Sequence, residues 1–432
     1  MSFPLPPAPR RIAGLAELRA VHQAFQWLHL NEVQLRRWQL EFLAIPAPPF
    51  GEGPRAAWFR DRFQDLGLEN VHIDAIGNAL GELRGANEGP DPPLMLLSAH
   101  LDTVFPEGTD CTPREDGDRI LGPGSCDNGA GLAGLLGLAA AMKWSGVEPA
   151  CTILFAANVG EEGEGDLRGM RHLFGSGSEY FQRIGAALAL EGSGTGSAVN
   201  RALGGRRLRV TVGGPGGHSW ADAGRLNPII ALSEAIAKLG DLRLPQRPRT
   251  TLNVGTIRGG TSVNSIPEFA TADFDLRSIA PIEIDRAELA VLRVLTNAVE
   301  RYNQPLAPAP SPGGVKAVIP DLRLTLHAER IGDRPAAMLM PGSAIAQSLS
   351  AVDRHLGIGT ELRIGSTDAN LPLSLGIPAL AVGAGGHGAG VHTLAEFYDP
   401  TGRELALRRV LLLALDACQI AAAPQSLDAA AD

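Results

Sequence analysis

Seven histidine and acidic residues stand out because short segments of the chain place them directly beside apolar runs or glycines. They are His100, Asp102, Asp127, Glu161, Glu162, Glu191 and His392. The apolar runs at 94–99, 151–159 and 186–190 predict buried strands, and each is followed at once by part of this set. Because functional side chains of α/β sheets gather at the carboxyl ends of the strands, we expect these residues to lie close together.

The types of these side chains fit a metal centre. Two histidines and three carboxylates supply the nitrogen and oxygen ligands suited to zinc, and they suffice for two divalent ions that share one carboxylate. One glutamate is then left over as the general base that hydrolysis requires. In an extended segment His100 and Asp102 point to the same side, so Asp102 can orient the imidazole. No G-x-S-x-G motif occurs, which disfavours a serine hydrolase.

Some of these residues also have an ordinary structural interpretation. An aspartate before a helix, such as Asp127, is commonly a cap, and the adjacent Glu161 and Glu162 could form a solvated corner. A repeated acidic corner after successive apolar strands, with a histidine at each end of the set, favours a functional site over both.

Length and patterning predict two domains. The chain has 432 residues, of which 44% are hydrophobic, enough for a large core. Strands alternate with helices in 1–204 and 334–432, which predicts an α/β domain with a mixed sheet flanked by helices. Residues 205–333 follow a β-α-β-β-α-β order, which predicts an inserted α+β domain of ferredoxin-like type. One helical stretch is expected over 15–45. The first ten residues are expected to be frayed, and the tail at 426–432 is expected to be disordered.

Composition excludes several classes of function. A net charge of −9 disfavours a nucleic-acid binder, and no apolar stretch of 18 residues predicts a membrane span. The four cysteines form no CxxC pair, so neither a disulfide scaffold nor a thiolate zinc site is indicated. No secretory signal is apparent at the N-terminus, and we expect a cytoplasmic protein.

Together, the runs SAHLDTV, GPGSCDNGAG, EEGEG, ALEG and VHTLAEF resemble the dinuclear zinc metallopeptidase-20 family. That family contains peptidase T, glutamate carboxypeptidase, acetylornithine deacetylase and aminoacylase. The resemblance extends over about residues 35–420, with five motifs in the same order. It implies a zinc-exopeptidase type of catalytic domain, an inserted lid and dimerisation domain, and a homodimer.

The resemblance implies a ligand set for two metal ions. His100, Asp127 and Glu191 would hold one ion. Asp127, Glu162 and His392 would hold the other, so that Asp127 bridges the pair. Zinc is expected, with manganese or cobalt as alternatives.

The resemblance also assigns the residues beside the ligands. Glu161 would be the general base that deprotonates the metal-bridging water and protonates the leaving amine, and Asp102 would fix the ring of His100. The peptide bond after Asp127 is expected to be cis. Glu164 is interpreted as a solvated loop residue, because the family has no role for it, and His387 as a loop residue rather than a ligand.

Further residues would contact substrate. The resemblance implies that His218 crosses a dimer interface to stabilise the tetrahedral oxyanion of the partner's site. Asn264 would hold the transition-state oxygen, and Arg277 would bind a substrate carboxylate bidentately. Ser366 and Thr367 match a loop of the family near the active site, where they would touch substrate.

The metal centre alone does not select a substrate. The turn at His218 and the loop at 365–372 resemble those of peptidase T and glutamate carboxypeptidase, and this resemblance favours a di- or tripeptidase acting on small peptides. The alternatives are hydrolysis of an N-acyl amino acid or of another small-molecule C–N bond, including hydrolytic deamination. A catalytically dead binding protein is a distant alternative, because all six ligand and base positions keep usable residue types.

Overall fold

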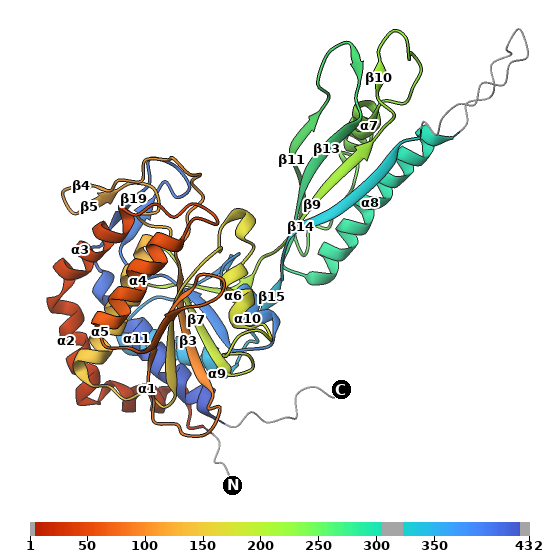
Figure 1. Ribbon diagram of the computed structural model, residues 1–432. Helices are drawn as coiled ribbons and strands as arrows, with labels where there is room; N and C mark the ends of the chain where they lie inside the picture. The colour runs from red at the N-terminus through yellow and green to blue at the C-terminus, as the bar shows by residue number, and fades with distance from the viewer. Residues whose placement is uncertain (1–4, 305–322, 424–432) are drawn as a thin grey trace, which may run out of the picture. The chain divides into compact units, whose positions relative to one another are not determined.

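The structure, a computed structural model, describes residues 5–304 and 323–423 (Figure 1). It divides into two compact units. The large unit comprises the described residues up to Ala202 and from Ala337 onward, and the inserted unit comprises Leu203–Ala336. The tail expected to be disordered lies outside the described residues.

The large unit is built on a mixed sheet of nine strands. Its order is β1-β2-β6-β3-β7-β17-β8-β15, with β16 also paired to β8. The strands are β1 (Glu69–Ile73), β2 (Ala79–Leu83), β3 (Leu94–His100), β6 (Thr152–Asn158), β7 (Ile184–Leu190), β8 (Ser197–Ala202), β15 (Ala337–Met338), β16 (Glu361–Gly365) and β17 (Ala379–Val382).

Three central strands set the position of the site. β3, β6 and β7 are buried along their whole length, as continuous apolar runs predict for strands covered on both faces. They are parallel neighbours, and their register pairs His100 of β3 with Asn158 of β6. The residues that follow these strands therefore emerge at one edge of the sheet.

Helices flank this sheet, and the predicted α/β class is confirmed. α5 (Gly129–Ser145) is buried from Gly129 to Met142, because its glycines and alanines allow close approach on every side. Further helices of this unit are α4 (Gly53–Asp65), α6 (Arg168–Leu173), α9 (Ala344–Leu356), α10 (Asn370–Ser374) and α11 (Arg403–Ala422). Among the described residues, no helix combines the length and apolar character needed to cross a bilayer.

The N-terminal region differs from the single helical stretch expected over 15–45. It forms three helices, α1 (Ala8–Ala16), α2 (Arg19–Leu30) and α3 (Glu32–Leu43), so residues 8–10 are helical rather than frayed. Leu18 is extended, and Asn31 leaves the helical region while its side chain donates to the carbonyl of Trp27. A side-chain amide that bonds the main chain competes with helix continuation.

The inserted unit has the predicted element order. β9 (Gly204–Gly213), α7 (Pro228–Leu239), β11 (Thr250–Gly259), β13 (Phe269–Ser278), α8 (Pro281–Asn303) and β14 (Thr325–Arg334) form an antiparallel sheet, ordered β11-β13-β9-β14, with two helices packed on it. Alternate residues of β9 and β13 enter the core against these helices. A two-residue ribbon pairs β10 (Gly217–His218) with β12 (Ser265–Ile266).

A small four-stranded sheet completes the large unit. It joins β4 (Arg114–Asp116) and β5 (Arg119–Leu121) to β19 (Phe397–Asp399) and β18 (His387–Ala389). The segment between β18 and β19 carries His392. The pairing of β19 with β5 brings that late segment beside the chain that leads into Asp127.

Candidate metal centre

The first part of the centre surrounds His100, the last residue of β3. Its imidazole is completely buried. Nε2 lies 3.1 Å from Oδ1 of Asp127 and 3.4 Å from Oε1 of Glu191. Glu191 directly follows β7, and Asp127 comes two residues before α5. Two strand ends and one helix start thus place three ligand-type side chains together.

The second part of the centre surrounds His392. Its Nε2 lies 3.1 Å from Oδ2 of Asp127 and 2.8 Å from Oε1 of Glu162. Asp127 therefore presents one carboxylate oxygen to each imidazole. The two groups of side chains are neighbours joined through this single carboxylate.

The donor atoms fit divalent metal ions. Two ligands of one tetrahedral ion, each about 2.1 Å away, lie about 3.4 Å apart, and the separations around both imidazoles are close to this. Donor atoms of His100, Asp127 and Glu162 all lie within 4.8 Å of one another. Oε2 of Glu191 is buried and has no hydrogen-bond partner among the described residues. A cation would satisfy such an oxygen, and imidazole with carboxylate is a donor set that suits zinc.

The acids and imidazoles of the centre shift one another's pKa values. Burial opposes the charged imidazole of His100, but hydrogen bonds with surrounding carboxylates outweigh it and hold its pKa well above the ordinary value. Hydrogen bonds with Asp127 and Glu162 raise the pKa of His392 to about 10. Burial raises the pKa of Glu191 to about 7, although His100 opposes this. The centre thus concentrates negative charge around both imidazoles.

Asp102 connects two strand ends of the centre. Its main-chain oxygen lies 3.0 Å from Nδ1 of His100, so this residue does contact the imidazole. Its carboxylate accepts the main-chain N–H groups of Glu161 and Glu162, at 3.0 and 2.7 Å. All four residues are buried. Asp102 therefore positions the loop that carries the two glutamates as well as the histidine ring.

Glu396 is a buried acid that the sequence reasoning missed. It accepts main-chain N–H groups from Gly124, Cys126 and Asp127, at 2.8 to 2.9 Å. Burial raises the pKa of this carboxyl, against the three hydrogen bonds. The residue lies four positions after His392, so one short segment supplies that imidazole and also holds the loop of Asp127. An acid within the run TLAEF was the only available signal.

The turn into α5 is fixed by Asn128. Its Oδ1 accepts the N–H groups of Gly131 and Gly192, both at 3.1 Å, and its Nδ2 donates to the carbonyl of Leu190. This side chain ties the start of α5 to the end of β7. The peptide bond between Asp127 and Asn128 is cis, as the resemblance implied.

The loop after β16 also reaches this edge of the large sheet. Asp368 accepts from Nδ2 of Asn158, the last residue of β6. Of the two residues expected to touch substrate, Thr367 is buried and its hydroxyl accepts the N–H of Ala369, whereas Ser366 is half-buried.

Three of the expected site residues belong to the inserted unit. His218 is exposed, and the ribbon of β10 and β12 places it beside Asn264, whose main-chain oxygen accepts the N–H of Ser219. Arg277 lies near the other end of β13 and donates to Asp275. Eight residues of extended chain separate Arg277 from Phe269, about 26 Å at 3.3 Å per residue. Within the inserted unit, His218 and Asn264 lie together and Arg277 lies apart from them.

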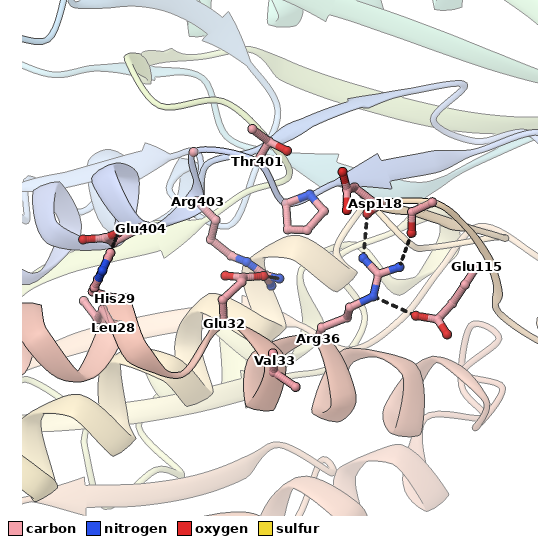
Figure 2. A pocket seen from close by; sticks show the side chains of 13 residues that line it. Leu28, His29, Glu32, Val33, Arg36, Glu115, Asp118, Thr401, Arg403 and Glu404 are labelled. Carbon is pink, nitrogen blue, oxygen red and sulfur yellow. Dashed lines mark hydrogen bonds and ion pairs between the residues drawn. The ribbon is translucent and has the colours of Figure 1, made fainter.

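A charged pocket of about 590 Å³ lies elsewhere in the large unit (Figure 2). Arg36 of α3 donates there to Glu115 and to the carbonyl of Asp118, and Arg403 of α11 pairs with Glu32. None of the residues of the metal centre lines this pocket.

Residues 96–415 match the sequence model of peptidase family M20/M25/M40. The chain belongs to this family. It is therefore a hydrolase, and the resemblance seen in its motifs is confirmed.

Individual relatives of this M20/M25/M40 member are distant. YqjE of Bacillus subtilis is 27% identical over 268 residues, which is 59% of this chain and 69% of that protein. A protein named Probable carboxypeptidase from Paracoccidioides brasiliensis is 26% identical over 52% of this chain, and the match spans about half of its length (54%). The solved structure of a tripeptidase from Staphylococcus aureus superposes with a TM-score of 0.69 at 21% identity, covering 90% of this chain and 99% of that one. This structural likeness shows the fold.

Proposed function

We propose that this protein is a dinuclear metal-dependent peptidase that hydrolyses amide bonds of small peptides. The observation that carries the proposal is the position of Asp127, whose two oxygens lie 3.1 Å from His100 and 3.1 Å from His392. A carboxylate shared between two ligand sets suits a pair of ions. The name of the tripeptidase that shares the fold agrees with a peptide substrate.

The ligand roles in the proposal follow the two groups of side chains. His100 and Glu191 would hold one ion and Glu162 and His392 the other, with Asp127 shared. When bound, the pair of ions supplies the Lewis acidity that polarises a scissile carbonyl and makes water more acidic. We propose zinc as the native metal, with manganese or cobalt as alternatives.

Glu161 would act as the general base. It follows β6 directly after a two-residue turn, and the hydrogen bond from its N–H to Asp102 holds its main chain in place. Its carboxylate would take a proton from the attacking water and give one to the leaving amine nitrogen, so that a neutral amine departs. Glu161 is buried, and a group held in position in a buried site needs little reorganisation at the moment of reaction.

The proposal includes the inserted domain, expected over 205–333, as a lid and dimerisation domain. His218 would stabilise the oxyanion at the centre of the partner chain in a homodimer, and Asn264 would accompany it because the ribbon joins them. Exposed Trp220 and Val263 flank this ribbon and suit burial in an interface. Arg277 would bind a substrate carboxylate, and Ser366 and Thr367 would line the substrate site. A cytoplasmic location remains a prediction from the sequence.

A mass-spectrometric hydrolysis panel tests the proposed function. Metal-loaded protein is offered free-amine di- and tripeptides and, in parallel, N-acyl amino acids. We expect cleavage of the peptides, and we expect Glu161→Ala to lower kcat by about a thousandfold because the general base is lost. The matched control, Glu148→Gln, changes an exposed acid outside the centre and should cleave at the wild-type rate.

Other outcomes of the panel would assign the protein differently. Cleavage of acyl amino acids alone would make it a deacylase with the same centre. If the metal-loaded protein cleaves neither peptides nor N-acyl amino acids, the peptidase proposal is contradicted. Other C–N bonds, including those broken by hydrolytic deamination, should then be tested. Full activity of the Glu161→Ala protein would contradict the role of this residue.

A further inference from the structure

A second pocket of the large unit, of about 840 Å³, adjoins the segments that form the metal centre. Val104 lines it and comes two residues after Asp102. Glu164 also lines it and comes two residues after Glu162. Since consecutive Cα atoms are 3.8 Å apart, the Cα atoms within each pair lie at most about 7.6 Å apart. The walls of this pocket, named here the proline pocket, therefore begin at the edge of the centre.

The proline-rich wall of the pocket is tied to the strand that bears His100. Arg55 is buried, and its guanidinium donates to the carbonyl of Ile45 at 2.6 and 2.9 Å and to the carbonyl of Leu101 at 2.7 Å. The N–H of Thr103 donates to the carbonyl of Ala47 at 3.0 Å. Leu101 and Thr103 are the residues on either side of Asp102. The wall is thus held in a fixed position beside the centre before any substrate arrives.

The chemistry of the pocket combines an apolar wall with acidic residues. Five prolines line the wall, and Phe50 is 64% exposed. Arg168 lies over that ring at 5.2 Å, but its guanidinium is paired with buried Glu52. The charged side chains that line the pocket itself are Glu107 and Glu164, both exposed carboxylates. Such a site attracts a ligand that carries an apolar group next to a positive charge.

We propose that the proline pocket binds the N-terminal residue of a peptide substrate. The apolar side chain of that residue packs against the prolines and Phe50, and its α-ammonium group donates to the carboxylate of Glu164. In a peptide cleaved after its first residue, a single carbon separates the ammonium nitrogen from the scissile carbonyl. Glu164 is two residues from Glu162, so the proposed ammonium site lies on the same short segment as a proposed metal ligand. The inference rests on the proposed function and deepens it, because it selects aminopeptidase action over deacylation.

Glu164 is exposed, as its interpretation as a solvated loop residue expects, and the proposal adds a role for it in binding substrate. The proposal also predicts a substrate preference. An N-acyl substrate carries no ammonium group and therefore makes no ion pair with Glu164. A substrate with an acidic first residue is repelled by the carboxylates of the pocket. We therefore expect tripeptides that begin with leucine to be cleaved in preference to those that begin with aspartate or with an acetylated residue.

The test compares Leu-Gly-Gly, N-acetyl-Leu-Gly-Gly and Asp-Gly-Gly with wild-type and Glu164→Gln proteins, both loaded with metal. We expect Glu164→Gln to lower kcat/KM for Leu-Gly-Gly about tenfold, the usual size of one charge-assisted hydrogen bond. Any slow cleavage of the acetylated peptide should not change. Glu148→Gln removes the same charge from an exposed position elsewhere, and it should leave kcat/KM for all three peptides unchanged.

A second variant tests the apolar wall. Val104→Phe narrows the pocket, so kcat/KM for Leu-Gly-Gly should fall relative to that for Ala-Gly-Gly, while the melting temperature reports whether the protein still folds. Peptide cleavage by Glu164→Gln at the wild-type rate, or a preference for the acetylated peptide, would overturn this inference and leave a metal-dependent hydrolase. Absence of all peptide cleavage by metal-loaded wild type would overturn the proposed function and this inference together.

Discussion

At the scale of single residues, Glu396 gives the sharpest prediction, because its carboxylate accepts three main-chain N–H groups from the loop of Asp127. Glu396→Gln keeps the size of the side chain but turns an NH₂ group toward at least one of these donors. The loop should then loosen, and affinity for the metals should fall about 10- to 100-fold, as for other residues that orient ligands. Titration of metal against a competing chelator measures this.

A control variant and the recovery of kcat at saturating metal test whether Glu396 acts only by positioning the loop of Asp127. Glu148→Gln should bind metal like the wild type. At saturating metal, Glu396→Gln should recover most of its kcat, because the residue contacts neither substrate nor metal. A fall in kcat that excess metal does not restore, with unchanged affinity, would contradict the positioning role.

The same residue shows the limit of reasoning from sequence at this scale. His100 and Glu191 could be selected because each comes at the end of an apolar strand, where the topology of a sheet predicts a site. Glu396 does not follow an apolar strand, so its sequence position does not indicate a site. Its hydrogen-bond partners lie 269 to 272 residues away along the chain, and only the folded small sheet brings them together.

At the scale of elements, the start of α5 packs closely against Asn128 and the end of β7. A Cβ atom at Gly131 would lie 2.1 Å from Oδ1 of Asn128 and 2.8 Å from the carbonyl of Leu190. Gly131→Ala should therefore displace Asn128 and lower the free energy of unfolding by about 2 kcal/mol or more. Gly14 lies in α1 with no heavy atom within 4 Å of its virtual Cβ. Gly14→Ala should raise stability by about 0.5–1 kcal/mol, because alanine restricts the unfolded chain.

Denaturant unfolding of the two glycine variants distinguishes packing from helix propensity. Both changes put alanine into a helix, so propensity alone predicts stabilisation in both. A stable Gly131→Ala protein with wild-type metal affinity would contradict the close approach at this turn.

The elements were predictable where burial is uniform and less so where helices end. The apolar runs at 94–99, 151–159 and 186–190 became β3, β6 and β7 with shifts of one or two residues at most. The apolar spacing over 15–45 continues through Leu18 and Asn31, where the chain breaks. Apolar spacing records which face is buried, and it does not register an extended residue or a side chain that bonds the main chain.

At the scale of the whole molecule, the proposed roles of His218 and Arg277 require more than one chain. Both would serve one substrate, yet β13 separates the ribbon end from Arg277 by about 26 Å. A homodimer resolves this, since one chain would supply the metals and Arg277 and its partner would supply His218 and Asn264. In the proposed homodimer, each active site would contain parts of both chains.

Mixing two inactive variants tests this arrangement. Glu161→Ala lacks the proposed base but keeps His218, whereas His218→Ala lacks the proposed oxyanion donor but keeps Glu161. After joint refolding of equal amounts with random pairing, half of the dimers contain one chain of each variant. One of the two sites in each mixed dimer contains both Glu161 and His218, so activity should return to about a quarter of wild type. Each variant refolded alone should stay inactive, and sedimentation should confirm dimers in every sample. A mixture no more active than its components, although mixed dimers form, would place His218 at the centre of its own chain or outside catalysis, because only donation across the interface can restore a complete site.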